Sequence, residues 1–156
     1  MKSRVKLFAV ILCVLLVNLW LFSCSEKKKE GKVIVTEKEF TLEKDGKVAF
    51  SLDVNGKVKN VGDVDVKNVV VTGRCSACDE VMISGKWFVT QIEKTPQQKD
   101  TISYLPKGAE MKYKFKGIAF YYTKAGETPK TNPEGLDVYI ESFETAGKLV
   151  PGGSNF

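Results

Sequence analysis

Histidine is missing from all 156 residues of the chain, and its absence removes several kinds of chemistry. Ser-His-Asp and Cys-His catalytic arrangements need an imidazole as general base, so the chain cannot build either of them. A c-type haem needs His directly after a C-x-x-C motif, whereas Asp79 follows Cys75-Ser76-Ala77-Cys78 here. Asp and Glu are plentiful, but no specific pair is indicated for paired-carboxylate hydrolysis. We therefore predict a protein that is not an enzyme and that carries no cofactor.

Long apolar runs are scarce, because the chain has one, at residues 7–22. Its 16 residues fall short of the about 20 that a membrane-spanning helix usually needs. A basic segment without acidic residues precedes the run, and Ser23-Cys24 ends it. This order is typical of a secretory signal peptide, and the alternative is an uncleaved membrane anchor with an incidental cysteine. The basic residues are Lys2, Arg4 and Lys6.

The segment Leu21-Phe22-Ser23-Cys24 resembles the lipobox of bacterial lipoproteins. The resemblance implies cleavage after residue 23 and a diacylglyceryl group on the thiol of Cys24. It therefore predicts a protein of the cell envelope whose membrane partner is reached through this lipid. Ser25 stands where enterobacterial lipoproteins of the inner membrane carry Asp, which favours the outer membrane and a domain facing the periplasm. In a Gram-positive source the domain would lie outside the cytoplasmic membrane.

Removal of residues 1–23 changes both the charge and the cysteine content. The formal net charge of the whole chain is +5, and the removed segment carries three basic and no acidic residues, which leaves about +2. A domain this close to neutrality has no compositional case for binding nucleic acid. Cys13 leaves with the signal peptide and Cys24 is lipidated, so Cys75 and Cys78 remain as the two thiols of the mature chain.

The mature chain divides into a tether, one domain and a tail. Residues 24–32 are charged and have little to bury, so we expect a tether that is either a solvated spacer or a contact to anionic headgroups through its lysines. Residues 33–146 are expected to form a single β-sandwich domain. Residues 147–156, which contain Pro-Gly-Gly-Ser, are expected to form a flexible tail.

Apolar residues alternate with polar ones along most of the domain, as in Met111-Lys112-Tyr113-Lys114. Period two indicates half-buried antiparallel strands, and no amphipathic helix is evident. Turn sequences such as Asn60-Val61-Gly62-Asp63 and Pro106-Lys107-Gly108 separate the strands. We predict an all-β fold, an antiparallel β-sandwich of about seven to nine short strands. The expected strands include residues 33–35, 48–58, 69–71, 87–92, 101–105, 111–116, 118–122 and 138–143.

Residues 56–71, with the turn Asn60-Val61-Gly62-Asp63 between two Val-rich stretches, resemble the FxLyD family of envelope-associated domains. They are also similar to the bacterial immunoglobulin-like modules that include CARDB-type domains. The turn Leu105-Pro106-Lys107-Gly108 resembles a turn in the same families. The resemblance covers about residues 48–143 and implies an immunoglobulin-like sandwich that serves as a binding or structural module. It brings no catalytic residues.

The C-x-x-C motif, Cys75 to Cys78, leaves three interpretations open. A local disulfide would fix the shape of a turn. A redox-active pair would need a thiol of lowered pKa, which Arg74 favours and Asp79 and Glu80 oppose. A structural zinc usually has four N or S ligands, so two thiolates with Asp79 or Glu80 would be a poor site. We favour the disulfide.

Two groups of adjacent aromatic residues, Trp87-Phe88 and Phe120-Tyr121-Tyr122, supply the candidates for partner binding, namely Trp87, Tyr121 and Tyr122. Neighbouring side chains in a strand point to opposite faces, so at least one member of each group should face outward or lie beneath a loop. Residues 123–136, with two prolines and two glycines, are expected to form a long loop of functional use or a tolerated insertion. We expect an unidentified envelope protein or polymer as partner. The alternative is a thiol-disulfide or metal-binding protein that uses Cys75 and Cys78.

Overall fold

The computed structural model describes residues 29–90 and 94–146, and these residues form an almost purely β structure. The expected signal peptide, Cys24 and the tail at 147–156 lie outside the described residues. Within them no helix is long and apolar enough to cross a membrane. In chain order the elements are β1 (Val33–Asp45), β2 (Ala49–Asn60), β3 (Val66–Cys75), β4 (Trp87–Phe88), the 3-10 turn η1 (Pro96–Gln98), β5 (Lys99–Leu105), β6 (Glu110–Phe115), β7 (Phe120–Tyr122) and β8 (Leu136–Thr145).

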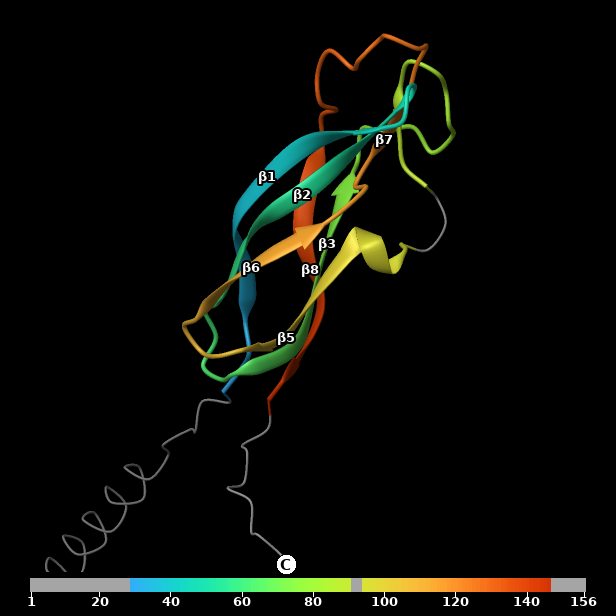
Figure 1. Ribbon diagram of the computed structural model, residues 1–156. Coiled ribbons are helices and arrows are strands. Elements are labelled where there is room, and N and C mark those ends of the chain that lie inside the picture. Colours follow the sequence, from blue (N-terminus) through green and yellow to red (C-terminus); the bar gives the residue numbers. More distant parts are fainter. Residues whose placement is uncertain (1–28, 91–93, 147–156) are drawn as a thin grey trace, which may run out of the picture.

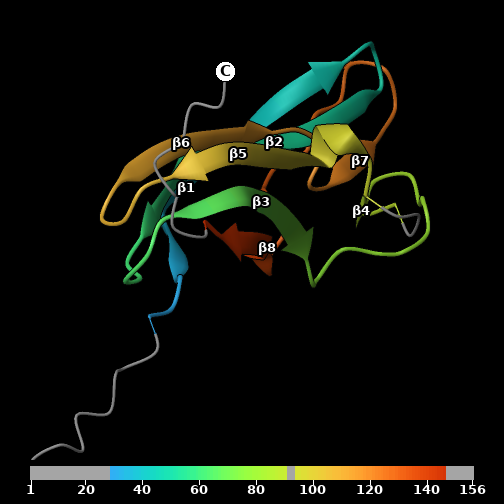
Figure 2. The same ribbon diagram turned by 90° about the horizontal axis from the view of Figure 1, so that it is seen from below.

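Two antiparallel sheets build the sandwich (Figure 1). In the first, β2 pairs with β1 on one side and with β6 and β7 on the other, and β4 pairs with β7. In the second, β3 lies between β5 and β8. Seen from below, β3 and β8 form a layer under β2 and β6 (Figure 2). The chain passes from β2 to β3 in the second sheet, returns to the first sheet at β4, crosses again to β5 and returns with β6 beside β2. The predicted all-β sandwich is confirmed.

The core lies between the two sheets because each strand turns its apolar positions to the same side. Leu52, Val54 and Val58 of β2 are fully buried and face residues of the second sheet, such as Val71 and Leu105. Burying such side chains contributes roughly 1.5–3 kcal/mol each. The ring of Tyr113 in β6 stacks on Phe115, and its hydroxyl donates to the carbonyl of Glu37 at 3.0 Å. Burial raises the pKa of Tyr113 to about 12.

Asn60, which the sequence places in a turn, is a fully buried polar residue of the structure. Its Nδ2 donates to the carbonyls of Val64 at 2.8 Å and Leu105 at 3.1 Å. Its Oδ1 accepts the backbone N–H of Gly62 at 3.0 Å. A buried amide is tolerated when its donors and acceptor are satisfied, and here it links the β2–β3 turn to the end of β5.

Most strand boundaries differ from the sequence prediction; β3, for example, spans Val66–Cys75 instead of residues 69–71. β1 continues to Asp45 instead of ending near Val35, because its polar residues pair with β2 along the whole length while most of their side chains remain exposed. β4 has two residues, since residues 89 and 90 leave the sheet, and 91–93 lie outside the described residues. The long loop ends at Gly135, because Leu136 already pairs with Cys75.

The two ends of the sandwich carry different parts of the chain. At one end, which we call the base, residues 30–32 lie against the β2–β3 turn: Lys32 O accepts from Val61 N at 2.8 Å and Glu30 O from Asp63 N at 2.8 Å. At the other end, which we call the tip, lie residues 75–88 and 120–135 (Figure 1). β1 starts at the base and ends in the turn at the far end.

Candidate functional site at the tip

Cys75 and Cys78 form a disulfide, with an S–S distance of 1.97 Å and a Cα–Cα distance of 5.5 Å. β3 ends at Cys75, and the bridge closes the turn that follows this strand. Cys75 is buried against the core cluster, and the half-buried Cys78 packs against the same cluster. The prediction of a local disulfide is therefore confirmed.

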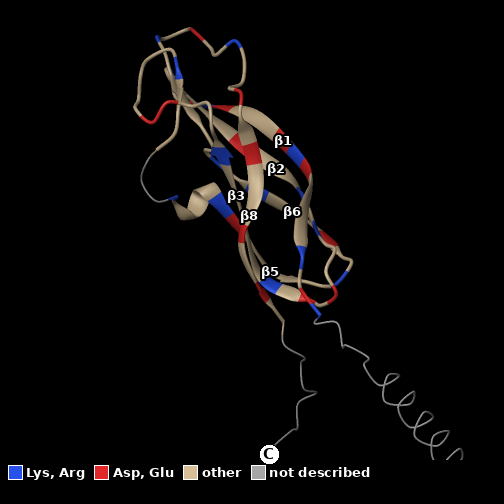
Figure 3. Ribbon diagram, turned by 180° about the vertical axis from the view of Figure 1, so that it is seen from behind, with Lys and Arg blue, Asp and Glu red and all other residues tan. Residues whose placement is uncertain are grey.

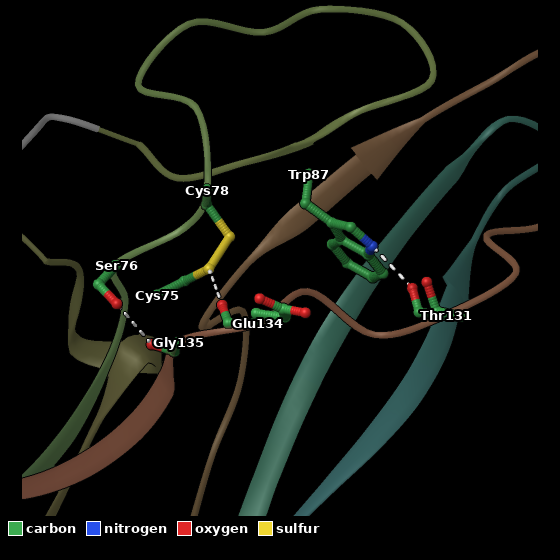
Figure 4. The surroundings of a disulfide bond; sticks show 7 residues. All are labelled: Cys75, Ser76, Cys78, Trp87, Thr131, Glu134 and Gly135. Atoms are coloured by element: carbon green, nitrogen blue, oxygen red, sulfur yellow. Dashed lines mark hydrogen bonds between the residues drawn. A yellow bond between two sulfur atoms is a disulfide. The ribbon is translucent and has the colours of Figure 1, made fainter.

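The residues around the disulfide join the end of β3 to the end of the long loop (Figure 4). The N–H of Ser76 donates to Gly135 O at 3.0 Å, and Ser76 Oγ donates to the same oxygen at 3.2 Å. Cys75 Sγ lies 3.6 Å from the carbonyl oxygen of Glu134. A disulfide sulfur has no hydrogen, so this approach is a hydrogen bond only in the dithiol form. Gly135 has φ +70°, and an added Cβ would lie 2.2 Å from Ser76 Oγ, which restricts the position to glycine.

A loop with three exposed apolar residues projects from the tip between the disulfide and β4. Val81, Met82 and Ile83 are 66%, 61% and 43% exposed. Asp79 closes the loop where it meets β4. Its N–H donates to Trp87 O at 2.9 Å, and its carbonyl accepts from Val89 N at 2.9 Å. The sequence prediction assigns this loop no role. The available signal was a short apolar run between Glu80 and the Ser84-Gly85 turn, without the alternation of a strand.

The structure separates the three aromatic candidates into two roles. Trp87 and Tyr121 are half-buried, and their ring centroids are 5.2 Å apart. Trp87 Nε1 donates to Thr131 O at 3.0 Å, so this pair fastens the long loop to the sheet (Figure 4). Tyr122 is 38% exposed and stacks on Phe88 with 5.5 Å between centroids. Tyr122 is thus the most exposed of the three candidates.

Charges at the tip and along the strands are of both signs and interspersed (Figure 3). Asp137, at the start of β8, accepts from Lys38 of β1 at 3.0 Å and lies 3.4 Å from Arg74. The hydrogen bond from Lys38, with help from the Val138 N–H and the charge of Arg74, lowers the pKa of Asp137 below its usual 3.8. Within residues 29–90 and 94–146 no group of three or more Cys, Asp or Glu side chains is placed to hold a metal ion.

Comparison with known proteins gives no relative, because the chain matches no protein-family model, no curated protein and no solved structure. The FxLyD-like and CARDB-like character of residues 48–143 and the lipobox character of residues 21–24 therefore stay resemblances.

Proposed function

We propose that the protein is a lipid-anchored, non-catalytic module of the cell envelope that binds or braces another envelope component with its tip. The lipobox resemblance at Cys24 supports the anchor, and Ser25 supports the outer membrane with the domain in the periplasm. The observation that carries the proposal is the placement of the exposed apolar loop and the long loop at the end opposite residues 30–32.

The distances fit a short-range display of the tip. Glu30 lies six positions after Cys24, and this stretch reaches at most about 20 Å when extended. β1 has 13 residues and runs from the base to the far end, which corresponds to about 40 Å. The tip would therefore meet partners within about 60 Å of the membrane surface. A rigid sandwich on a short tether suits contact with a fixed structure of the envelope better than a search through solution.

The side chains of the tip also suit binding. Exposed apolar residues such as Val81 and Met82 bury surface when a partner covers them, and an exposed tyrosine adds a ring with a polar end. The disulfide and the Trp87–Thr131 hydrogen bond hold the two loops in place, which reduces the entropy lost on binding.

Photo-crosslinking in intact cells tests the proposal. A photoreactive amino acid at Met82 should give a reproducible adduct with an envelope protein or polymer, whereas the same residue at Lys107, in the exposed turn at the base, should not. Cells producing each variant at equal level supply the matched control. No adduct from position 82, or the same adduct from both positions, would contradict the proposed role of the tip.

A second candidate function is thiol-disulfide exchange at Cys75 and Cys78. The half-buried position of Cys78 favours it, because an attacking thiolate needs access to one sulfur. This function requires that cells contain a fraction of the dithiol form. Alkylation of intact cells with and without prior reduction measures that fraction, and complete protection before reduction would leave the disulfide as a structural element.

A further inference from the structure

An open depression of about 780 Å³ lies on the outer face of the first sheet, beside the tip. Residues paired across an antiparallel sheet point to the same face, so the register identifies its floor. Ser51 pairs with Phe120, and Ala49 pairs with Tyr122. All four line the depression, as does Asp53, two residues further along β2. The depression thus runs from the aromatic residues of β7 along the outer side of β2.

The aromatic end of the depression is a preformed ring platform. Phe88 stacks on Tyr122 with an interplanar angle of 17° and lies 5.9 Å from Phe120 between centroids. Phe88 is buried, so one side of Tyr122 is supported by protein while the tyrosine as a whole is 38% exposed. A supported ring with an open face accepts another flat, weakly polar surface with little loss of entropy.

Asp53 supplies a buried carboxylate on this face. It is 6% exposed, and its Oδ1 accepts the N–H of Gly117 at 3.3 Å, where the chain bulges between β6 and β7. This is the one hydrogen bond that the described residues give to the carboxylate. Asp53 lines the depression, so its carboxylate borders the space that a ligand would enter.

Charged residues around the depression do not neutralise one another. Asp53 lines it together with Glu43, Lys44, Asp45, Lys114 and Lys116. None of these six side chains takes part in the ion pairs found among the described residues. Further along the same face Lys57 and Glu37 are paired at 2.7 Å. The depression therefore offers donors and acceptors of both signs that are free to meet a ligand.

We propose that this depression binds a short stretch of polysaccharide. A sugar ring has a flat face of C–H groups that can stack on Tyr122. Its hydroxyls both donate and accept, so they can satisfy Asp53 and the lysines at once. The equal numbers of carboxylates and lysines favour an uncharged ligand over a polyanion or a polycation. A purely apolar ligand would leave the charged groups without partners. The inference rests on the proposed function and deepens it, because it names an envelope polymer as the partner.

The test is an NMR titration of the full chain, solubilised in detergent, with two probes: the tetramer of N-acetylglucosamine, and soluble glycan fragments released from peptidoglycan by muramidase. At least one probe should shift the signals of Tyr122, Phe120 and Lys114, with a dissociation constant of about 1 mM or tighter. Tyr122→Ala should weaken this binding by about five- to tenfold. Tyr122→Phe should retain most of it, and so should Tyr104→Ala, which removes an exposed tyrosine of the second sheet.

Two further variants keep the test decisive if Tyr122→Ala unfolds. Asp53→Asn preserves an oxygen for the Gly117 N–H, and Lys116→Ala changes an exposed side chain, so both should fold and both should weaken binding. The absence of shifts with either probe at about 10 mM, or equal affinity of all variants, would overturn the polysaccharide assignment. If the titration fails but position 82 still crosslinks to a protein, the polysaccharide assignment is wrong and the proposed function stands. If position 82 also gives no adduct, the polysaccharide assignment and the proposed function are both wrong.

Discussion

Removing the disulfide should destabilise the domain by a limited and calculable amount. Cys75 and Cys78 are three positions apart, and the chain-entropy relation for a loop this short gives about 2 kcal/mol. For a domain of this size that loss lowers the Tm by about 8 °C. The double substitution Cys75→Ser and Cys78→Ser tests this value.

The fold should survive the substitution because the disulfide is not part of the strand pairing. β3 remains hydrogen-bonded to β8 as far as Cys75, and the Ser76 N–H still reaches Gly135 O. A serine at position 75 is buried, but the Glu134 carbonyl, 3.6 Å from the present Sγ, gives its hydroxyl an acceptor. The unfolding transition should therefore stay cooperative.

Differential scanning calorimetry of three samples separates loss of the bond from effects of the new side chains: the oxidised wild type, the reduced wild type and the double Ser variant. We expect the last two to melt close together and below the first. A variant without any cooperative transition would refute the view that the core and the strand pairing carry the fold. A variant as stable as the oxidised wild type would refute the entropic contribution.

The remaining predictions concern single residues. Asn60→Ala should cost about 3 kcal/mol in urea unfolding, because it removes a fully buried amide whose Nδ2 is a donor to the carbonyls of Val64 and Leu105, and a cost below about 1 kcal/mol would contradict this assignment. Asp137→Asn should reduce the dependence of stability on pH in acid. The folded-state pKa of Asp137 is lowered, so its contribution is present above the ordinary pKa of 3.8 and is lost as pH falls through the lowered value. Thermal melts between about pH 5 and pH 2 should fall more steeply for the wild type, and parallel curves would refute this. Gly135→Ala should destabilise the domain by about 2 kcal/mol, because of the positive φ and the contact with Ser76 Oγ, and unchanged stability would show that the loop relaxes.

The fold class followed from the sequence because most strands bury one face. The alternation correctly placed Tyr113 and the apolar residues of β2 in the core, whereas Met111, expected on the same side as Tyr113, is 43% exposed. The full length of β1 was not predicted, because its second half is largely exposed on both sides and is held by backbone pairing with β2. Periodicity reports burial, so a strand that buries little leaves little trace in it.

The tip was predictable in part. C-x-x-C at the end of a Val-rich strand correctly indicated a disulfide, and alternation correctly placed Trp87 and Phe88 on different faces. The hydrogen bond from Trp87 to Thr131 joins residues 44 positions apart, and no local pattern encodes such a contact. The same holds for Asp53 and Lys114, whose shared depression depends on how three strands pair.

The measurement that tests the central claim most directly is the intact mass of the protein isolated from its native envelope, alkylated with and without reduction. The account predicts a chain that starts at Cys24 and carries a lipid mass there, with Cys75 and Cys78 alkylated only after reduction. A chain that retains residues 1–23, or one in which Cys24 is a free thiol, would contradict the lipid anchor on which the display of the tip depends.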